Sequence, residues 1–213
     1  MFQKSFGTSG VNAIGSFQLS QLNSSSVKSK LKAAGINTNS KQYKAAVKQM
    51  MSAGNGAMYG NIQGIKNLMS HYDKDGDYIN PVNGLAGLLV TDENESSRKR
   101  IISIPDSSKE EMYELTKKEF LRENGVHNGD TTKRTDVYNN LYRKMPKKDR
   151  LAAGYTLEKY ERIYRQAFYD AAKKADPNWE IGKPIKDGAL DSVTRETAES
   201  GKSPAQATLD TKI

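Results

Sequence analysis

Residues 156–176 read TLEKYERIYRQAFYDAAKKAD, and this stretch decides the fold class of the chain. Its apolar and aromatic side chains recur at steps of three and four residues, which is the spacing of one face of a helix. These side chains are Leu157, Tyr160, Tyr164, Ala167, Phe168, Ala171 and Ala175. We interpret them as core packing in which the alanines let a neighbouring element approach closely, so no cofactor is needed to explain them. Asp176-Pro177 ends the predicted helix, which begins at Thr156.

Shorter helical patterns precede this run. They surround Val27 and Leu31, Tyr43 to Met51, residues 57–72, Met112 to Phe120, and Val137 to Met145. Glycines at Gly35 and Gly125 are typical helix stops, and Ser107 or Ser108 with Glu110 or Glu111 forms a capping-box pattern. The sequence therefore predicts a mainly α protein of about five to seven helices.

Two apolar segments predict a small β-hairpin. Residues 85–90 read LAGLLV, which is too short for a good helix. Residues 100–104 read RIISI, a β-branched stretch that stops at Pro105. Both could pair across the polar loop of residues 91–98.

Polar segments flank the predicted helices. Residues 1–25 are rich in Ser, Gly, Asn and Gln and predict a flexible arm, whose scattered phenylalanines could mediate self-association. Residues 188–213 predict a polar C-terminal tail, and both termini are expected to be flexible. The mainly helical domain then covers residues 26–187, with Trp179 and Ile181 folding back onto its core.

Composition excludes several classes of site. The 213 residues include no cysteine, which excludes disulfides, thiolate zinc sites and a cysteine nucleophile. No apolar run approaches the ~20 residues of a membrane helix, so no membrane span is expected. No cleavable signal peptide is evident, and the default localisation is cytoplasmic. A polar N-terminus is also compatible with export that leaves it uncleaved.

Positive charge is concentrated in the first third of this basic chain. Residues 1–72 contain eight lysines and no Asp, Glu or Arg, while the remainder holds 25 basic and 25 acidic residues. A one-signed segment predicts weak binding to a polyanion, or simply supports solubility. We favour solubility, because the segment lacks the arginines and the many aromatics that nucleic-acid readers use.

Residues 71–81 read HYDKDGDYINP and hold the best candidate for chemistry. Asp73, Asp75 and Asp77 alternate in a turn, so their oxygens could point at one hard cation such as calcium. The spacing matches positions one, three and five of an EF-hand loop. Tyr78 and Gly84 depart from the pattern, because an EF-hand needs glycine and a bidentate glutamate there.

An irregular calcium site is therefore the leading metal prediction. Its ligands would be the three aspartates with the carbonyl of Ile79 and with Asn80. Asn83, Asp92 or Glu93 and water could complete the shell. The alternative is a solvated turn that binds no ion, because Asp and Gly are common turn residues.

Enzymatic readings of the same cluster are weaker. Asp73-Lys74-Asp75-Gly76-Asp77 resembles the nucleophile motif of haloacid-dehalogenase-type phosphatases, but that motif follows a buried strand and here a helical pattern precedes it. A magnesium-dependent hydrolase using Asp73 and Asp75 is kept as an alternative. His127 and Asp130 in a Gly-rich loop are interpreted as surface residues. No complete catalytic signature is present, so a binding or structural role is preferred to an enzyme.

Several segments resemble an uncharacterised domain family of clostridial-type gut bacteria. They are YDKDGDYINP at 72–81, GLAGL at 84–88, TKKEF at 116–120, NGDTTKR at 128–134, and YER with QAFYDA within 160–171. The resemblance covers most of the chain after about Ser26. It implies a bacterial source, and it implies no activity, cofactor or site residue.

Overall fold

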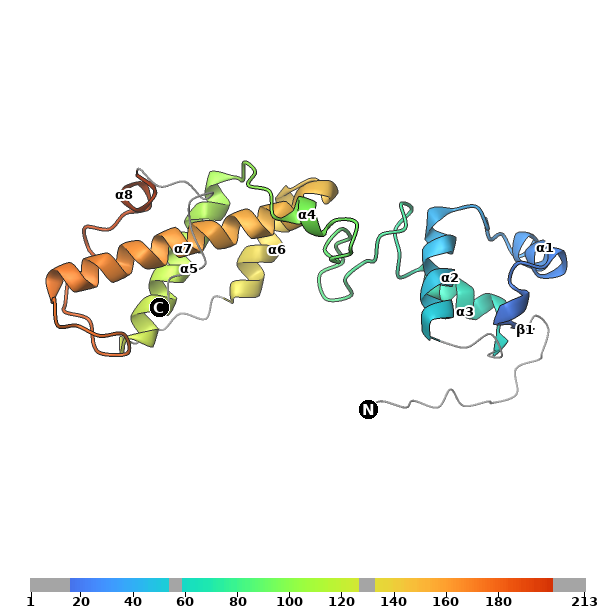
Figure 1. Cartoon of the computed structure of the whole chain (residues 1–213), viewed down its shortest axis with the longest axis horizontal. Coiled ribbons are helices and arrows are strands. Elements are labelled where there is room, and N and C mark those ends of the chain that lie inside the picture. The colour runs from blue at the N-terminus through green and yellow to red at the C-terminus, as the bar shows by residue number, and fades with distance from the viewer. Residues whose placement is uncertain (1–15, 54–58, 127–132, 201–213) are drawn as a thin grey trace. The chain divides into compact units, whose positions relative to one another are not determined.

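A computed structural model describes residues 16–53, 59–126 and 133–200. The chain divides into two compact units, Met1–Ala86 (unit 1) and Gly87–Ile213 (unit 2). The predicted mainly α class is confirmed, since the described residues form eight α-helices and one pair of short strands (Figure 1). Two of these helices, in unit 2, have only four and five residues, which is why the count exceeds the predicted five to seven. The flexibility predicted for residues 1–15 and 201–213 lies outside the described residues.

Unit 1 is built from short elements. In chain order they are β1 Phe17–Gln18, the 3-10 helix η1 Leu19–Gln21, α1 Ser25–Ala33, α2 Lys41–Ala53, β2 Tyr59–Gly60 and α3 Ile62–Met69. The Ser24 hydroxyl caps α1 by accepting from the Val27 backbone N–H, and Gly35 follows the helix with a φ of 79°. The predicted glycine stop is thus confirmed, because this conformation costs glycine little.

The core of unit 1 includes side chains from the segment predicted as a polar arm. Phe17, Leu19 and Leu22 are buried together with Leu31 of α1 and Ile65 of α3. Strand β1 pairs antiparallel with β2, and Phe17 lies opposite Gly60. Three apolar side chains spaced in a polar context carry no clear periodicity, so only the tertiary partners revealed that residues 17–22 pack.

The predicted hairpin between residues 85–90 and 100–104 is wrong. Neither segment forms a strand, and Leu89, Val90 and Ile101 are exposed. A helix takes the place of the strand partner: the backbone N–H of Ile102 donates to the Thr156 hydroxyl at 3.1 Å. Ile104 is buried in the helical core of unit 2, so its β-branched side chain is accommodated without a sheet.

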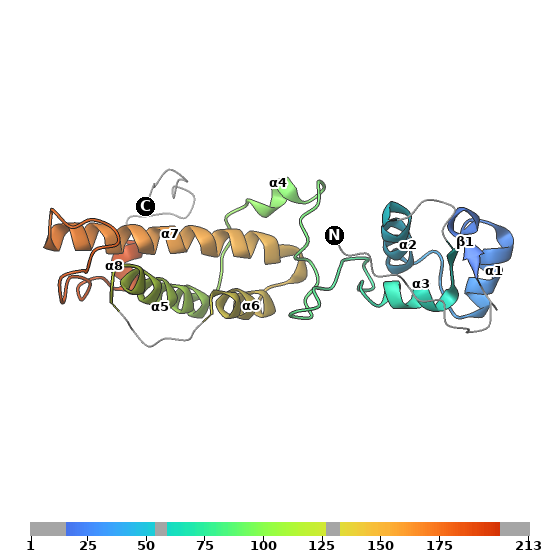
Figure 2. The same cartoon turned by 90° about the horizontal axis from the view of Figure 1, so that it is seen from below.

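Unit 2 is organised around one long helix. Its elements are α4 Glu95–Arg98, α5 Asp106–Glu123, α6 Arg134–Lys144, the 3-10 helix η2 Lys147–Asp149, α7 Arg150–Ala175 and α8 Arg195–Glu199. Helix α7 contacts α5, α6 and α8. Figure 2 shows α5 and α6 on one side of α7, and in Figure 1 α5 crosses behind it. The predicted helix over residues 156–175 is confirmed, and it begins six residues earlier at Arg150.

Aromatic packing holds the helices of unit 2 together. Phe168 of α7 is fully buried, with its ring centroid 5.5 Å from that of Tyr113 and 5.8 Å from that of Phe120. Trp179 packs against Phe120 at 6.0 Å and is only 4% exposed, so its predicted return to the core is confirmed. The same prediction is wrong for Ile181, which is 48% exposed. Offset and tilted aromatic pairs of this kind add about 0.5–1.5 kcal/mol each beyond area burial.

The chain after Trp179 also packs on this core. Leu190 and Val193 are buried, and the Tyr113 hydroxyl donates to the Val193 carbonyl. The Tyr164 hydroxyl donates to Glu199 of α8 at 2.6 Å. Burial, followed by the Glu199 carboxylate, holds the pKa of Tyr164 far above its usual range. Residues 188–200, predicted as part of a polar tail, therefore form a covering segment over α5 and α7.

Two helix starts differ from the sequence prediction. Helix α5 begins at Asp106 with Pro105 as its N-cap, and no side chain caps it, so the predicted capping box at Ser107 or Ser108 is wrong. Ser108 is instead fully buried. Helix α3 covers residues 62–69 rather than 57–72, because Asn61 caps it by accepting from the Gly64 N–H at 2.7 Å.

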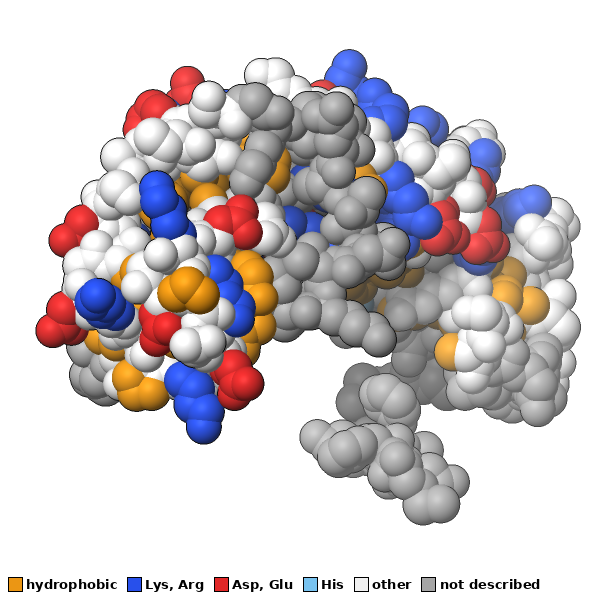
Figure 3. Space-filling model, turned by 60° about the vertical axis from the view of Figure 1, so that its left-hand side comes forward, with side chains coloured by type: hydrophobic (Ala, Val, Ile, Leu, Met, Phe, Trp, Pro, Cys, Tyr) orange, Lys and Arg blue, Asp and Glu red, His pale blue; other side chains and the backbone are white. Residues whose placement is uncertain are grey.

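Charge differs between the two units. Unit 1 has nine lysines, three aspartates and no Arg or Glu, so its net charge is +6, whereas unit 2 has 24 basic and 22 acidic residues. Figure 3 shows blue and red side chains interspersed on the described surface in that view. Unit 2, where both signs are present, contains ion pairs such as Arg100 with Asp149, Arg134 with Glu119 and Lys144 with Glu111.

The aromatic core generates a stability prediction. Replacing Phe168 by Ala should lower the free energy of unfolding of unit 2 by about 3–5 kcal/mol, because the cavity cannot collapse among rigid rings. Urea titration followed by Trp179 fluorescence measures this, since Trp179 is the only tryptophan. Leu89→Ala is the control: Leu89 is 56% exposed and its loss should change stability by less than about 0.5 kcal/mol. Equal effects of the two variants would contradict the proposed core.

Candidate functional site

The aspartate-rich turn follows α3 and is fastened to α2. The Gln42 side-chain amide donates to the carbonyls of Met69 at 2.9 Å and Tyr72 at 2.8 Å. The Tyr72 hydroxyl donates to the Gln49 side chain at 2.8 Å. Two glutamines, seven residues apart on the same face of α2, therefore fix the carbonyls at the end of α3 and the entry to the turn. Sequence reasoning missed them, because glutamine on a helix is ordinarily a solvated residue.

Asp73 organises the turn. Its Oδ1 accepts the backbone N–H of Asp75 at 2.9 Å and of Asp77 at 3.0 Å. Its own N–H donates to the Asp77 carbonyl at 2.9 Å, and its carbonyl accepts the Gly76 N–H at 3.0 Å. The backbone of residues 73–77 thus closes around one carboxylate oxygen, an arrangement in which Asp satisfies backbone donors that a regular element would satisfy elsewhere.

Gly76 is required at the apex of the turn. Its φ is 85°, and a Cβ built there would lie 3.0 Å from the Lys41 carbonyl oxygen at the start of α2. The turn therefore approaches the backbone of α2 so closely that a side chain would not fit without movement. Glycine is favoured here by both its backbone freedom and its lack of a Cβ.

A short antiparallel ladder closes the base of the turn. Tyr72 and Tyr78 form an isolated bridge, and their rings meet edge to face with centroids 5.9 Å apart. The Ile79 N–H donates to the His71 carbonyl at 2.8 Å. Burial, with Tyr78 as the smaller cause, raises the pKa of Tyr72, whose hydroxyl donates to Gln49.

The remaining predicted ligands lie in the following turn. Asn80 Oδ1 accepts the Val82 N–H at 2.9 Å, and Asn83 Oδ1 accepts the Leu85 N–H at 3.0 Å. Ile79 forms a bridge with Ala86. Both asparagines therefore stabilise turns, and Asn80 stands next to Ile79 at the exit of the aspartate turn.

The predicted ligands belong to two different units of the chain. Asp73, Asp75 and Asp77 share one five-residue turn, whereas Asp92 and Glu93 belong to unit 2. Within residues 16–53, 59–126 and 133–200, no group of three or more His, Asp or Glu side chains is arranged to hold a metal ion. His127 and Asp130 lie outside the described residues.

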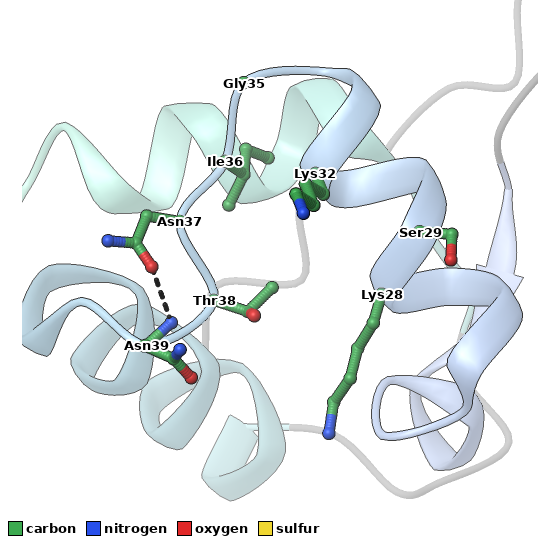
Figure 4. A pocket seen from close by; sticks show the side chains of 8 residues that line it. All are labelled: Lys28, Ser29, Lys32, Gly35, Ile36, Asn37, Thr38 and Asn39. Atoms are coloured by element: carbon green, nitrogen blue, oxygen red, sulfur yellow. Dashed lines mark hydrogen bonds between the residues drawn. The ribbon is translucent and has the colours of Figure 1, made fainter.

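Unit 1 also contains a hollow of about 480 Å³ that the sequence did not reveal. Its walls are α1 and the segment between α1 and α2, and its lining residues are Lys28, Ser29, Lys32, Gly35, Ile36, Asn37, Thr38 and Asn39. Figure 4 shows Thr38 projecting from this segment toward the side of α1 that carries Lys28 and Lys32. The lysines are spaced four residues apart, which the sequence does show, but the facing wall depends on the chain reversal at Gly35.

Unit 2 contains a network of ion pairs that the sequence analysis did not predict. Arg134 at the start of α6 contacts Glu119 of α5 and Glu161 of α7, each at 2.5 Å. Arg165 contacts Glu123 at 2.7 Å and Glu161 at 3.5 Å. The pKa of the Arg134 guanidinium lies above its usual range. The largest cause is its hydrogen bond to Glu161, and the hydrogen bond to Glu119 adds to the effect. The partners come from three helices, so no local spacing could have indicated them. We interpret this network as a set of ion pairs that holds α5, α6 and α7 together.

Comparison with protein families identifies the chain. The family described as a domain of unknown function (DUF3879) matches residues 36–213. The chain belongs to this family. The resemblance to an uncharacterised domain family is thereby confirmed, while a clostridial source stays a prediction. No curated protein and no solved structure matches the DUF3879 chain.

The DUF3879 match spans α2, the aspartate turn and all of unit 2. It begins at Ile36, one of the residues that line the hollow beside α1. No helix among the described residues is long and apolar enough to cross a membrane.

The apex of the turn generates a prediction about backbone strain. Gly76→Ala should lower the opening free energy of unit 1 by about 1–3 kcal/mol, because alanine disfavours positive φ. Amide hydrogen exchange in α2 and α3 measures this free energy. Gly84→Ala is matched, since Gly84 has a φ of 70° but nothing within 4 Å of its Cβ position. Gly76→Ala should cost more; a smaller cost than that of Gly84→Ala would refute the close approach to Lys41.

Proposed function

We propose that the chain is a binding or structural protein in which the turn of residues 73–77 binds calcium. The single observation that supports this is the closure of the turn around Asp73, whose Oδ1 accepts the N–H groups of both Asp75 and Asp77. This closure holds three carboxylates on a five-residue segment whose backbone is fixed. A fixed backbone lowers the entropy cost of gathering the oxygens around an ion.

The ligand set would be irregular. Asp73, Asp75 and Asp77 would supply carboxylate oxygens, Ile79 its carbonyl and Asn80 its amide oxygen, with water completing the six to eight ligands that calcium takes. Asp75 and Asp77 are exposed, so their side chains can rotate toward a common point when the ion binds. The hard oxygen donors fit calcium, and no cysteine or described histidine cluster competes for a softer metal.

The role of the ion would be architectural. Three aspartates at alternating positions repel one another, and a divalent cation would replace this repulsion by attraction. The turn is already tied to α2 through Gln42, Gln49 and the approach of Gly76 to Lys41. An ion there would therefore stiffen the junction between α2, α3 and the exit of unit 1.

The hydrolase alternative uses the same residues differently. It requires Asp73 or Asp75 to attack substrate or to hold magnesium for a water nucleophile. Asp73 Oδ1 is committed to two backbone hydrogen bonds, which is a structural use of that oxygen. This observation favours binding over catalysis at Asp73.

Calcium should raise the melting temperature of the protein. If the ion binds only the folded state, calcium at a hundred times its dissociation constant stabilises by about 2.7 kcal/mol, because binding shifts the unfolding equilibrium by mass action. Differential scanning calorimetry with millimolar calcium, and then with excess chelator, measures the shift. An unchanged midpoint in calcium would refute the proposal.

Isosteric variants separate the ion from the fold. Asp73→Asn with Asp75→Asn and Asp77→Asn should abolish the calcium response, while the asparagine oxygen at position 73 can still accept the two N–H bonds. The control Asp92→Asn with Glu93→Gln removes exposed acidic groups of unit 2 and should leave the response intact. Hydrolysis of a phosphate ester that depends on magnesium and on Asp73 would instead support the enzyme alternative.

A further inference from the structure

The hollow beside α1 is polar, positively charged and independent of the aspartate turn. Lys28 and Lys32 lie one helical turn apart and are both exposed, so their ammonium groups can reach the same side of the hollow. Its volume of about 480 Å³ falls in the range of small-molecule sites, about 300–1,000 Å³. Ile36 at its floor is buried, which fixes the segment that forms the facing wall.

Neither lysine has a carboxylate to neutralise it within this part of the fold. Residues 1–72 contain no Asp or Glu, and the only acidic residues of unit 1 are the three aspartates of the turn. Basic side chains of unit 2 such as Lys109, Arg162 and Arg195 contact acidic groups. Two lysines over a hollow, in a segment of residues 1–72 without Asp or Glu, are therefore a different arrangement.

Side chains supply donors to the hollow. Four backbone N–H groups of the connecting segment are already used: Gly35 and Ile36 donate to carbonyls of α1, Asn39 donates to Asn37 Oδ1, and Ser40 donates to the Asn37 carbonyl. The donors that line the space are the ammonium groups of Lys28 and Lys32 with the hydroxyls of Ser29 and Thr38 (Figure 4). Asn39 adds a side-chain amide.

We infer that this hollow is a binding site for a phosphate group. Two ammonium ions and neighbouring hydroxyls match an anion with several acceptor oxygens, and lysine binds phosphate as a point charge. The approach of a dianion gains from both lysines, whereas a neutral ligand would leave them without a partner. The phosphate could be carried by a small molecule or by a polyphosphate-type chain, since both present the same group to Lys28 and Lys32.

The test compares two double variants of equal charge. In the full-length protein, Lys28→Gln with Lys32→Gln removes the two lysines of the hollow. Lys44→Gln with Lys48→Gln removes two exposed lysines that are also one turn apart but lie on α2. Both variants lower the net charge by two, so a general loss of electrostatic attraction affects them alike. The substituted side chains are exposed, and circular dichroism should show both variants folded.

Titrations with inorganic phosphate and with tripolyphosphate, followed by amide chemical shifts, give the readout. Shifts should centre on residues 28–39, and the Lys28/Lys32 variant should weaken binding at least tenfold while the Lys44/Lys48 variant weakens it less than threefold. Tighter binding of tripolyphosphate than of phosphate would indicate a polymer or polyphosphate ligand; equal binding would indicate a single phosphate group. Equal weakening in the two variants, or no localised shifts, would overturn the site.

Discussion

The structure of unit 2 depends on the burial of one face of α7. Tyr164 and Phe168 are fully buried, and a 26-residue helix cannot remove such rings from water by itself. Helix α5 supplies Tyr113 and Phe120 against them, and the chain then returns through Trp179 to cover what the two helices leave exposed. Because aromatic side chains bury large areas at fixed geometry, the position of α5 relative to α7 follows from these contacts. The ion pairs of Arg134 and Arg165 lie at the edges of the same helix interfaces.

Unit 1 meets a different constraint, because it is small and its helices carry only positive charge. They have no acidic residues for ion pairs with one another, and the core gathers apolar side chains from β1, η1, α1, α2 and α3, including Phe17. Neutral side chains provide the polar connections: Gln42 and Gln49 hold the end of α3, and Ser24 and Asn61 cap helices. The aspartate turn brings the only negative charge of the unit, and its backbone is bound to one of its own carboxylates. A chain of this composition leaves lysines without carboxylate partners, and the hollow beside α1 is where two of them meet a shaped surface.

The candidate site shows how far local sequence can be read. The alternation of Asp73, Asp75 and Asp77 with Gly76 predicted a turn with converging polar groups, and the turn is present, with a positive φ at Gly76. The three carboxylates converge less than their spacing suggests. The spacing constrains the backbone, whereas exposed carboxylate side chains can adopt several rotamers. The attachment of the turn to α2 was not predictable, since Gln42 and Lys41 are about 30 residues away in sequence and neither type is diagnostic.

Sequence alone determined the helical class, the burial of Leu157, Tyr164 and Phe168 on α7, the stops at Gly35 and Gly125, and the burial of Trp179. Each of these follows from a local pattern: side chains spaced along one helix face, glycine at positive φ, or a large apolar ring that water disfavours. Tertiary structure alone decided that the chain forms two cores and that Phe17 packs in the core of unit 1. It also decided that the segment of Ile102 and Ile104 lies against helices instead of forming a hairpin. The reason is that a short apolar segment has no preference strong enough to select its own conformation. It adopts whichever partner buries its side chains and satisfies its backbone N–H groups, and for Ile102 that partner, the Thr156 hydroxyl, lies 54 residues further along the chain.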